Sequence, residues 1–182
     1  MKASHSKGLN LKPPRDLCCF LEAFNLFTES LTFGGSAMTV EPFAEADKKD
    51  ILRLLSEENL PTEDLNIQTL ENFLVAREGN GATVGAVGVE VRLDAGLLRS
   101  LVVHPSYRGR GLGKQLTSEI ETYARGLGVK TLFLLTMTAA DFFPRLGYQP
   151  ILRSDVPQSI AETFEFKSAC PVSAVCLRKN LE

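Results

Sequence analysis

The sequence predicts an α/β domain, in which a mixed β-sheet of about seven strands carries helices on both faces. Strand-like and helix-like segments alternate along most of the chain, which is typical of sheets covered by helices. The apolar segment 131–135 requires cover on both of its faces, as a central strand does. With 182 residues, the chain is long enough for one domain with a substantial core.

The elements predicted before residue 104 are a strand, two helices and three further strands, over residues 39–43, 44–58, 62–70, 72–77, 82–92 and 97–103. The first helix is indicated by Ile51, Leu54 and Leu55, which share one face at helical spacing. Thr62 is predicted to cap the second helix, because its hydroxyl can accept from a free backbone N–H group. In residues 82–92, valine alternates with glycine and charged residues at the two-residue period of a strand.

A tight hairpin is predicted between the strands over 82–92 and 97–103. Its turn is Asp94-Ala95-Gly96, with Gly96 suited to a left-handed conformation. This hairpin is expected to place Glu90, on the polar side of its strand, opposite Arg99 or Ser100, depending on the register.

The elements predicted after residue 111 are a long helix, a strand, a short helix, a strand, a helix and a last strand, over residues 112–125, 131–135, 139–145, 148–152, 157–166 and 174–177. The long helix is indicated by Leu112, Leu116 and Ile120, which recur at four-residue spacing. Gly126 and Gly128 follow it, as glycine commonly does where a helix ends.

The run Arg-Gly-Arg-Gly-Leu-Gly over residues 108–113 carries the most specific chemical signal of the chain. It joins an apolar strand to the start of the long helix, where the first backbone N–H groups have no partner and the helix dipole favours an anion. Glycine lets that backbone approach a phosphate, and Arg108 and Arg110 add positive charge. The run therefore predicts a phosphate site; the alternative is a helix start whose glycines bind nothing.

The spacing of the glycines decides which phosphate site is predicted. A dinucleotide-binding Gly-x-Gly-x-x-Gly pattern is excluded because the glycines at 109, 111 and 113 are evenly spaced. A P-loop is excluded because Gly113-Lys114 is followed by Gln115, not by serine or threonine.

Arg108-x-x-Gly111-x-Gly113, preceded by Leu-Val-Val-His-Pro and Tyr107, resembles the pyrophosphate motif of GCN5-related N-acetyltransferases (GNAT). The resemblance covers the chain from about Met38 onward. It implies the GNAT acyl-CoA N-acyltransferase fold and acetyl-CoA as co-substrate, with direct attack of an amine on the thioester.

Longer segments resemble the arsenic-resistance N-acetyltransferases of the ArsN group, which are related to amino-acid N-acetyltransferases; these are residues 96–103, 134–139, 142–148 and 170–174. This resemblance implies acetylation of the α-amine of a glutamate-like amino acid such as arsinothricin or phosphinothricin. Two alternatives stay open: a housekeeping glutamate acetyltransferase, and a non-catalytic module that binds acetyl-CoA.

The expected acetyl-CoA contacts come from the apolar strand, the glycine run and the segment after residue 135: Leu101, Val102, Val103, Arg108, Gly109, Arg110, Gly111, Leu112, Gly113, Lys114, Thr136, Phe142 and Phe143. Val103 is expected to stabilise the developing oxyanion through its backbone N–H. Phe143 stands where many GNAT enzymes have the tyrosine that protonates the thiolate, and Thr136 where many have asparagine. The general-acid step is therefore open.

Glu90 is the candidate general base, and a cross-strand ion pair with Arg99 is its alternative role. The expected acceptor-binding residues are Glu90, Arg99, Ser100 and Thr138. Arg99 is singled out because a charged residue in an apolar strand needs either an acidic partner or a ligand.

Composition limits the remaining function classes. The net charge of −2 argues against nucleic acid as a partner. A metal site is not expected, because the four cysteines show no Cys-x-x-Cys spacing and there are two histidines. Adjacent Cys18 and Cys19 make a poor disulfide framework, which favours a reducing, cytoplasmic location. A membrane span is not expected, because the apolar segment 17–27 is too short and is interrupted by Glu22.

Residues 1–37 are predicted to be a non-catalytic N-terminal extension, and residues 38–182 the GNAT domain. The extension is expected to hold an amphipathic helix over 17–31; an over-long reading frame is the alternative. A homodimer stays open, because Phe20, Phe24 or Phe27 could complete a dimer surface or the core.

Overall fold

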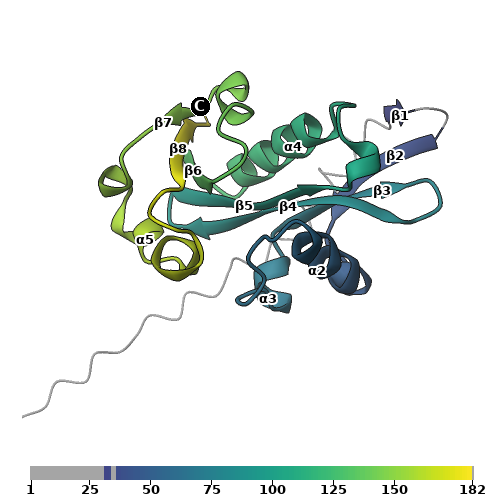
Figure 1. Cartoon of the computed structure of the whole chain (residues 1–182), viewed down its shortest axis with the longest axis horizontal. Coiled ribbons are helices and arrows are strands. Elements are labelled where there is room, and N and C mark those ends of the chain that lie inside the picture. The colour runs from purple at the N-terminus through teal and green to yellow at the C-terminus, as the bar shows by residue number, and fades with distance from the viewer. Residues whose placement is uncertain (1–30, 34–35, 182) are drawn as a thin grey trace, which may run out of the picture.

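The computed structural model describes residues 31–33 and 36–181, which form a mixed sheet with helices on both faces (Figure 1). The sheet of the described residues has eight strands in the order β1-β2-β3-β4-β5-β6-β8-β7. The strands are β1 (Leu31–Phe33), β2 (Ser36–Pro42), β3 (Phe73–Glu78), β4 (Thr83–Arg92), β5 (Ala95–Val103), β6 (Thr131–Thr136), β7 (Gln149–Pro150) and β8 (Val175–Asn180). Neighbouring strands are antiparallel, except that β5 and β6 are parallel. The predicted fold class is confirmed.

The two faces of the sheet are covered by different helices (Figure 1). One face packs on α2 (Lys48–Glu57) and α3 (Ile67–Leu70), and the other packs on α4 (Leu112–Gly126). On the α4 face, Leu116 and Ile120 are buried against strand residues such as Leu98. On the other face, Leu54 and Leu70 pack against Phe73.

A third cluster joins α5 (Gln158–Ala161) to the centre of the sheet, where Ile160 packs with Leu97 and Phe133. Short helical turns complete the described fold: η1 (Glu45–Asp47), η2 (Pro105–Tyr107), η3 (Phe143–Leu146), η4 (Arg153–Asp155) and the π-helical η5 (Glu165–Ala169). Because Leu132 and Leu134 belong to the α4 cluster and Phe133 to the α5 cluster, β6 is covered on both faces as predicted.

The sheet opens between its two parallel strands. In the pairing of β5 with β6, residues Ala95–Leu97 pair with Thr131–Phe133. Beyond those pairs β5 continues to Val103, while β6 remains paired with β8 as far as Thr136. Within the part of the chain that the structure describes, one edge of β5 therefore has no strand partner from Leu98 onward, and the site is built along that edge.

A β-bulge lies in β5 at the same place. Gly88 pairs with Arg99 and Ala86 pairs with Val102, so that two residues of β5 stand opposite one residue of β4. Ser100 adopts the left-handed conformation at φ 57°, which is rare for a residue other than glycine. The extra residue changes which side chains face each helix layer, so that Arg99 and Val102 share a face.

The predicted hairpin turn is wrong in detail. The turn residues are Leu93 and Asp94, because Arg92 already pairs with Ala95, and Leu93 takes the positive φ of 58°. Gly96 is a strand residue instead: a Cβ there would lie 2.9 Å from the Leu132 side chain, so glycine is needed for close packing. Glu90 consequently pairs with Leu97, not with Arg99 or Ser100 as expected.

Several other elements differ from their predicted bounds. Asn66, not Thr62, caps α3, since its side chain accepts from the Thr69 backbone N–H at 3.0 Å. The strand predicted over 148–152 is reduced to Gln149–Pro150. The helices predicted over 139–145 and 157–166 are shorter: 3₁₀ geometry covers 143–146, and α5 ends before the π-turn. Pro144 has no N–H group to bond the carbonyl oxygen of Ala140, which disfavours an α-helix over 139–145.

The predicted boundary after residue 37 falls within β2, because β1 and the start of β2 precede Met38. The helix expected over 17–31 lies outside the described residues except for Leu31, which is the first residue of β1. The cysteines at 18 and 19 also lie outside them. Among the residues that the structure describes, no helix is long and apolar enough to cross a membrane. In the same part of the chain, no group of three or more histidine, cysteine or acidic side chains could hold a metal ion.

Candidate active site

A groove of about 740 Å³ follows the open edge of β5 and reaches the N-terminus of α4. Most of the residues expected to bind acetyl-CoA line it: Leu101, Val102, Val103, Arg108, Gly109, Gly111, Leu112, Gly113, Lys114 and Phe142. The local sequence explains this arrangement. β5 is buried through its apolar side chains, and the glycine run then turns the chain directly into α4.

The backbone of the glycine turn is open to a ligand. Gly109 and Gly111 have φ angles of 74° and 88°, and Gly111 is the N-cap residue of α4. A Cβ built on either glycine would meet no atom within 4 Å, so the space beside them is free. The first N–H groups of α4 have no acceptor within the helix. This geometry fits a pyrophosphate group, whose oxygens need several donors at close range.

The backbone of Val103 faces the open edge of β5. His104 donates its N–H to the carbonyl oxygen of Val84 in β4 at 2.8 Å. Since successive residues of a strand direct their backbone groups to opposite edges, the N–H of Val103 points away from β4. Its carbonyl oxygen accepts from Nε of Arg108 at 2.9 Å on that same side. A thioester carbonyl lying along the groove can thus accept a hydrogen bond from Val103.

The three cationic residues predicted to contact acetyl-CoA differ in how they lie relative to the groove. Arg108 is held by Glu58, with Nη2 and Oε1 2.5 Å apart, so its guanidinium braces the groove wall. Lys114 is exposed and lines the groove. Arg110 is exposed, is absent from the groove lining and lies over the ring of Tyr107 at 5.9 Å.

The aromatic residues after β6 take separate places. Phe142 closes the groove beside α4, since a Cβ on Gly113 would lie 3.5 Å from its ring. Phe143 is buried and packs edge-on against Tyr148 with ring centroids 5.3 Å apart. Burial raises the pKa of Tyr148, which lies in the core and lines neither cavity of the site. Neither residue of that pair is placed to donate a proton to a thiolate.

A second, smaller cavity of about 120 Å³ opens between β5 and β6. Six predicted site residues line it, and four of them line this cavity without lining the groove: Arg99, Ser100, Thr136 and Phe143. Thr138 lines both this cavity and the groove, and so do Leu60, Leu101 and Ala139. The two spaces therefore meet beside Leu101, close to the backbone of Val103.

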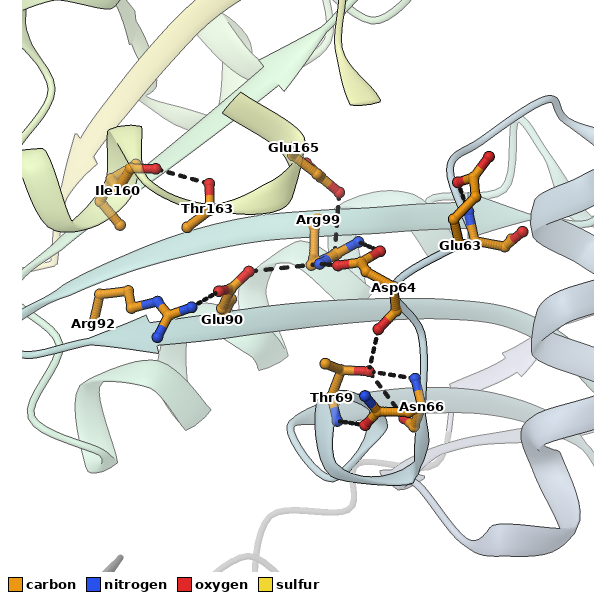
Figure 2. A network of polar contacts seen from close by, with 11 residues as sticks. Glu63, Asp64, Asn66, Thr69, Glu90, Arg92, Arg99, Ile160, Thr163 and Glu165 are labelled. Carbon is orange, nitrogen blue, oxygen red and sulfur yellow. Dashed lines mark hydrogen bonds and ion pairs between the residues drawn. The ribbon is translucent and has the colours of Figure 1, made fainter. Parts of the chain in front are cut away.

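Arg99 is surrounded by carboxylates (Figure 2). Its Nη1 and Nη2 donate to the carboxylate of Asp64 at 2.5 and 2.7 Å. Nη1 lies 3.5 Å from Glu90, and Nε lies 3.0 Å from Glu165. We call these four residues the Arg99 cluster. Glu90 also pairs with the exposed Arg92.

The Arg99 cluster has one cation for three acidic groups, and the protonation of Glu165 reflects this. Burial raises the pKa of Glu165 to about 7, while the Arg99 guanidinium opposes the rise. Asp64 and Glu90 add to the rise through their negative charge. A carboxyl group at the small cavity thus exchanges protons near neutral pH.

Two members of the Arg99 cluster, Asp64 and Glu165, were not expected from the sequence. Asp64 lies in the loop before α3, and Glu165 begins the π-helical turn η5, so neither falls in a recognisable motif. The one available signal was the charge of Arg99 in an apolar strand, which indicated an acidic partner but not its identity.

Residues 69–150 match the Acetyltransferase (GNAT) domain family. The matched residues include β4, β5, the glycine turn and α4, which build most of the groove. This segment of the chain therefore resembles a GNAT acetyltransferase domain. The GNAT fold extends beyond the match. N-acetylglutamate synthase from Neisseria gonorrhoeae, solved with coenzyme A and N-acetyl-glutamate, superposes with a TM-score of 0.71 at 19% identity, over 84% of this chain and 36% of that chain.

Curated relatives of this chain include amino-acid acetyltransferases. That of Azotobacter vinelandii is 32% identical over 170 residues, which are 85% of this chain and 39% of the relative. That of Pseudomonas aeruginosa is 39% identical over 99 residues, which are 54% of this chain and 23% of the relative. The chain therefore spans less than half the length of these relatives.

Proposed function

We propose that this protein is an N-acetyltransferase that moves the acetyl group of acetyl-CoA to the α-amine of an amino acid. The observation that carries the proposal is the groove, which joins an open helix N-terminus to the backbone edge of Val103. The names of the curated relatives supply the acceptor class.

In this proposal the backbone N–H groups of the glycine turn hold the pyrophosphate, with Lys114 beside them. The thioester lies along β5, where the N–H of Val103 stabilises the oxyanion that forms during attack. The amine approaches from the small cavity, where Ser100, Thr138 and the acidic Glu165 can hold an ammonium group before it loses its proton.

The finer proposal is a glutamate-like acceptor, such as arsinothricin or phosphinothricin. It is supported by the resemblance of the longer segments and by the bound N-acetyl-glutamate of the Neisseria gonorrhoeae enzyme. Direct binding of the acceptor's acidic group by Arg99 is part of this proposal. The three carboxylates that already contact Arg99 favour the alternative, in which Arg99 is held in structural ion pairs.

The acceptor is tested by measuring thiol release from acetyl-CoA with glutamate, phosphinothricin, and neutral and basic amino acids. Preference for phosphinothricin over glutamate indicates a resistance enzyme, and the reverse preference indicates a housekeeping enzyme. Binding of acetyl-CoA without thiol release in the presence of any acceptor would contradict the proposed activity. It would favour the alternative of a non-catalytic module that binds acetyl-CoA, which agrees with a phenylalanine, Phe143, at the position of the usual tyrosine.

The cofactor site is tested by Gly111→Val. We expect acetyl-CoA affinity to fall at least about tenfold, because a branched side chain at φ 88° strains the turn and fills the space of the anion. Gly81→Val is the matched control, since Gly81 also has a positive φ of 86° and open surroundings but lies outside the groove. Unchanged calorimetric affinity in a folded Gly111→Val protein would contradict the assignment.

A further inference from the structure

We propose that Glu165, rather than Glu90, is the general base that takes the proton of the acceptor ammonium group, with Arg99 as the residue that positions it. This inference rests on the proposed acetyltransferase function. It assigns a catalytic role to a residue outside the GNAT match over 69–150.

The three carboxylates around Arg99 differ in whether they line the cavities of the site. Glu165 lines the small cavity together with Ser100 and Leu101. Neither Asp64 nor Glu90 lines the small cavity or the groove. Because the two spaces meet beside Leu101, Glu165 is the acidic member of the Arg99 cluster that an amine facing the thioester can reach.

The contacts of the three carboxylates with Arg99 also differ. Asp64 accepts two hydrogen bonds from Nη1 and Nη2, so both of its oxygens are engaged. Nε of Arg99 lies 3.0 Å from Glu165 but makes no aligned hydrogen bond within the described part of the chain. The contact with Glu165 is an ion pair that holds its carboxylate in place and leaves its oxygens able to accept a proton.

The charges around Glu165 keep its protonation balanced near neutral pH. Burial raises its pKa to about 7; Arg99 counters this rise, and Asp64 and Glu90 reinforce it. Cys170 also faces this group, and burial raises the pKa of its thiol, so it is neutral there. Efficient general bases have a pKa near the working pH, because they are then both ionised and basic.

The proposed step balances in atoms and charge. The carboxylate of Glu165 takes one proton from the ammonium group and becomes a carboxylic acid. The nitrogen lone pair forms the bond to the thioester carbon, the carbon–sulfur bond breaks, and its electron pair leaves on sulfur. The second nitrogen proton reaches the thiolate and yields the thiol, so no acidic side chain is needed at Phe143. Glu165 then returns its proton to water.

The test compares Glu165→Gln with Glu90→Gln as the matched control, using the amino acid that the wild-type enzyme acetylates fastest. For the wild type, kcat/KM is expected to rise through a pKa near 7 and to level off below the amine pKa. Glu165→Gln is expected to lose about 100-fold or more at pH 7. Below the pKa of the amine, its kcat/KM should then rise tenfold per pH unit without levelling. The reason is that the variant can use only the fraction of the acceptor whose amine is already unprotonated. Glu90→Gln is expected to keep a kcat/KM near that of the wild type and to level off in the same way. Its profile should begin to rise at slightly lower pH, because Glu90 no longer raises the pKa of Glu165.

Folding and the proposed function are checked separately. Acetyl-CoA affinity and the melting temperature of Glu165→Gln are expected to match the wild type. If that variant does not fold, Glu165→Asp provides the second measurement: a slower enzyme that keeps the limb near pH 7 supports the base. Two results overturn the inference but leave the proposed function intact. In one, the wild type is active but its kcat/KM shows no rise through a pKa near 7. In the other, Glu165→Gln keeps that rise. A wild type that acetylates no amino acid overturns the proposed function and the inference together.

Discussion

At Arg99 one guanidinium contacts three acidic side chains while its own side chain is 2% exposed. Buried ion pairs gain little over apolar packing, because both charges must be removed from water. Removing one partner is a different matter, since the remaining charges stay buried without compensation. The Arg99 cluster is therefore a place where a single substitution separates a structural role from a ligand-binding role.

Arg99→Met is expected to lower the free energy of unfolding by about 3–5 kcal/mol at pH 8, because Glu165 and its neighbours then repel one another. The loss should be smaller at pH 5. There Glu165, with its pKa of about 7, is already protonated and needs no cation. Chemical denaturation at both pH values measures the difference.

Arg92→Met is the control for this measurement, because the Arg92 side chain is 49% exposed and pairs with Glu90 alone among the described acidic residues. An exposed pair of this kind contributes about 0–1 kcal/mol. If Arg99→Met instead keeps its stability and loses kcat/KM for glutamate, Arg99 binds the substrate and its ion-pair role is wrong.

Among the elements, β5 determines the shape of the site. Its first residues pair with β6, its bulge at Ser100 redirects its side chains, and its last residues present an unpaired edge to the groove. The hairpin that leads into β5 sets this register, because the pairing of Arg92 with Ala95 fixes every later pair up to the bulge.

The hairpin turn offers an element-scale prediction. Leu93 has a φ of 58° and is 82% exposed, so its side chain strains the backbone and gains little from packing. Leu93→Asn is expected to stabilise the fold by about 1 kcal/mol, since asparagine tolerates the left-handed region. For a chain of this size, that gain raises the melting temperature by about 2–4 °C.

Gly96→Ala is the comparison for the turn, because its Cβ would lie 2.9 Å from the side chain of Leu132. We expect this substitution to lower the melting temperature. A stabilised Gly96→Ala together with a destabilised Leu93→Asn would show that the register of the hairpin is wrong.

On the scale of the whole molecule, the site is assembled by elements that all follow β2. The groove and the small cavity are lined by residues 58–170 of the chain. β1 extends the far edge of the sheet, where Leu31 pairs with Met38 and Phe33 with Ser36. The sheet edge and the site are thus separate parts of the fold.

A chain that begins at Met38 is therefore expected to fold and to keep wild-type thiol release within about twofold. The pairs of β2 with β3 start at Met38 and Glu78, so they survive the deletion. The melting temperature is expected to fall slightly, because Met38 is buried and becomes the chain terminus. A chain that begins at Leu31 is the control. Insoluble protein from Met38 alone would show that residues 31–37 complete the fold.

The sequence alone determined the features that depend on neighbouring residues. The glycine run, the helix that follows it and the buried strand before it are local patterns, and residues of all three line one groove in the structure. Periodicity likewise predicted β4, β5, α4 and β6 and the mixed sheet. A helix period or a glycine at positive φ acts within a few residues, so it can be recognised from the order of residues.

The tertiary structure alone decided the register of the hairpin, the bulge at Ser100 and the identity of the acidic partners of Arg99. Asp64 and Arg99 lie 35 residues apart in sequence and meet only because the loop before α3 packs beside β5. Glu165 arrives from a π-helical turn whose position follows from the packing of α5. No local pattern encodes such encounters, because they depend on how whole elements share one core. The charge of Arg99 in an apolar strand indicated an acidic partner, but the identity of that partner depends on the tertiary structure.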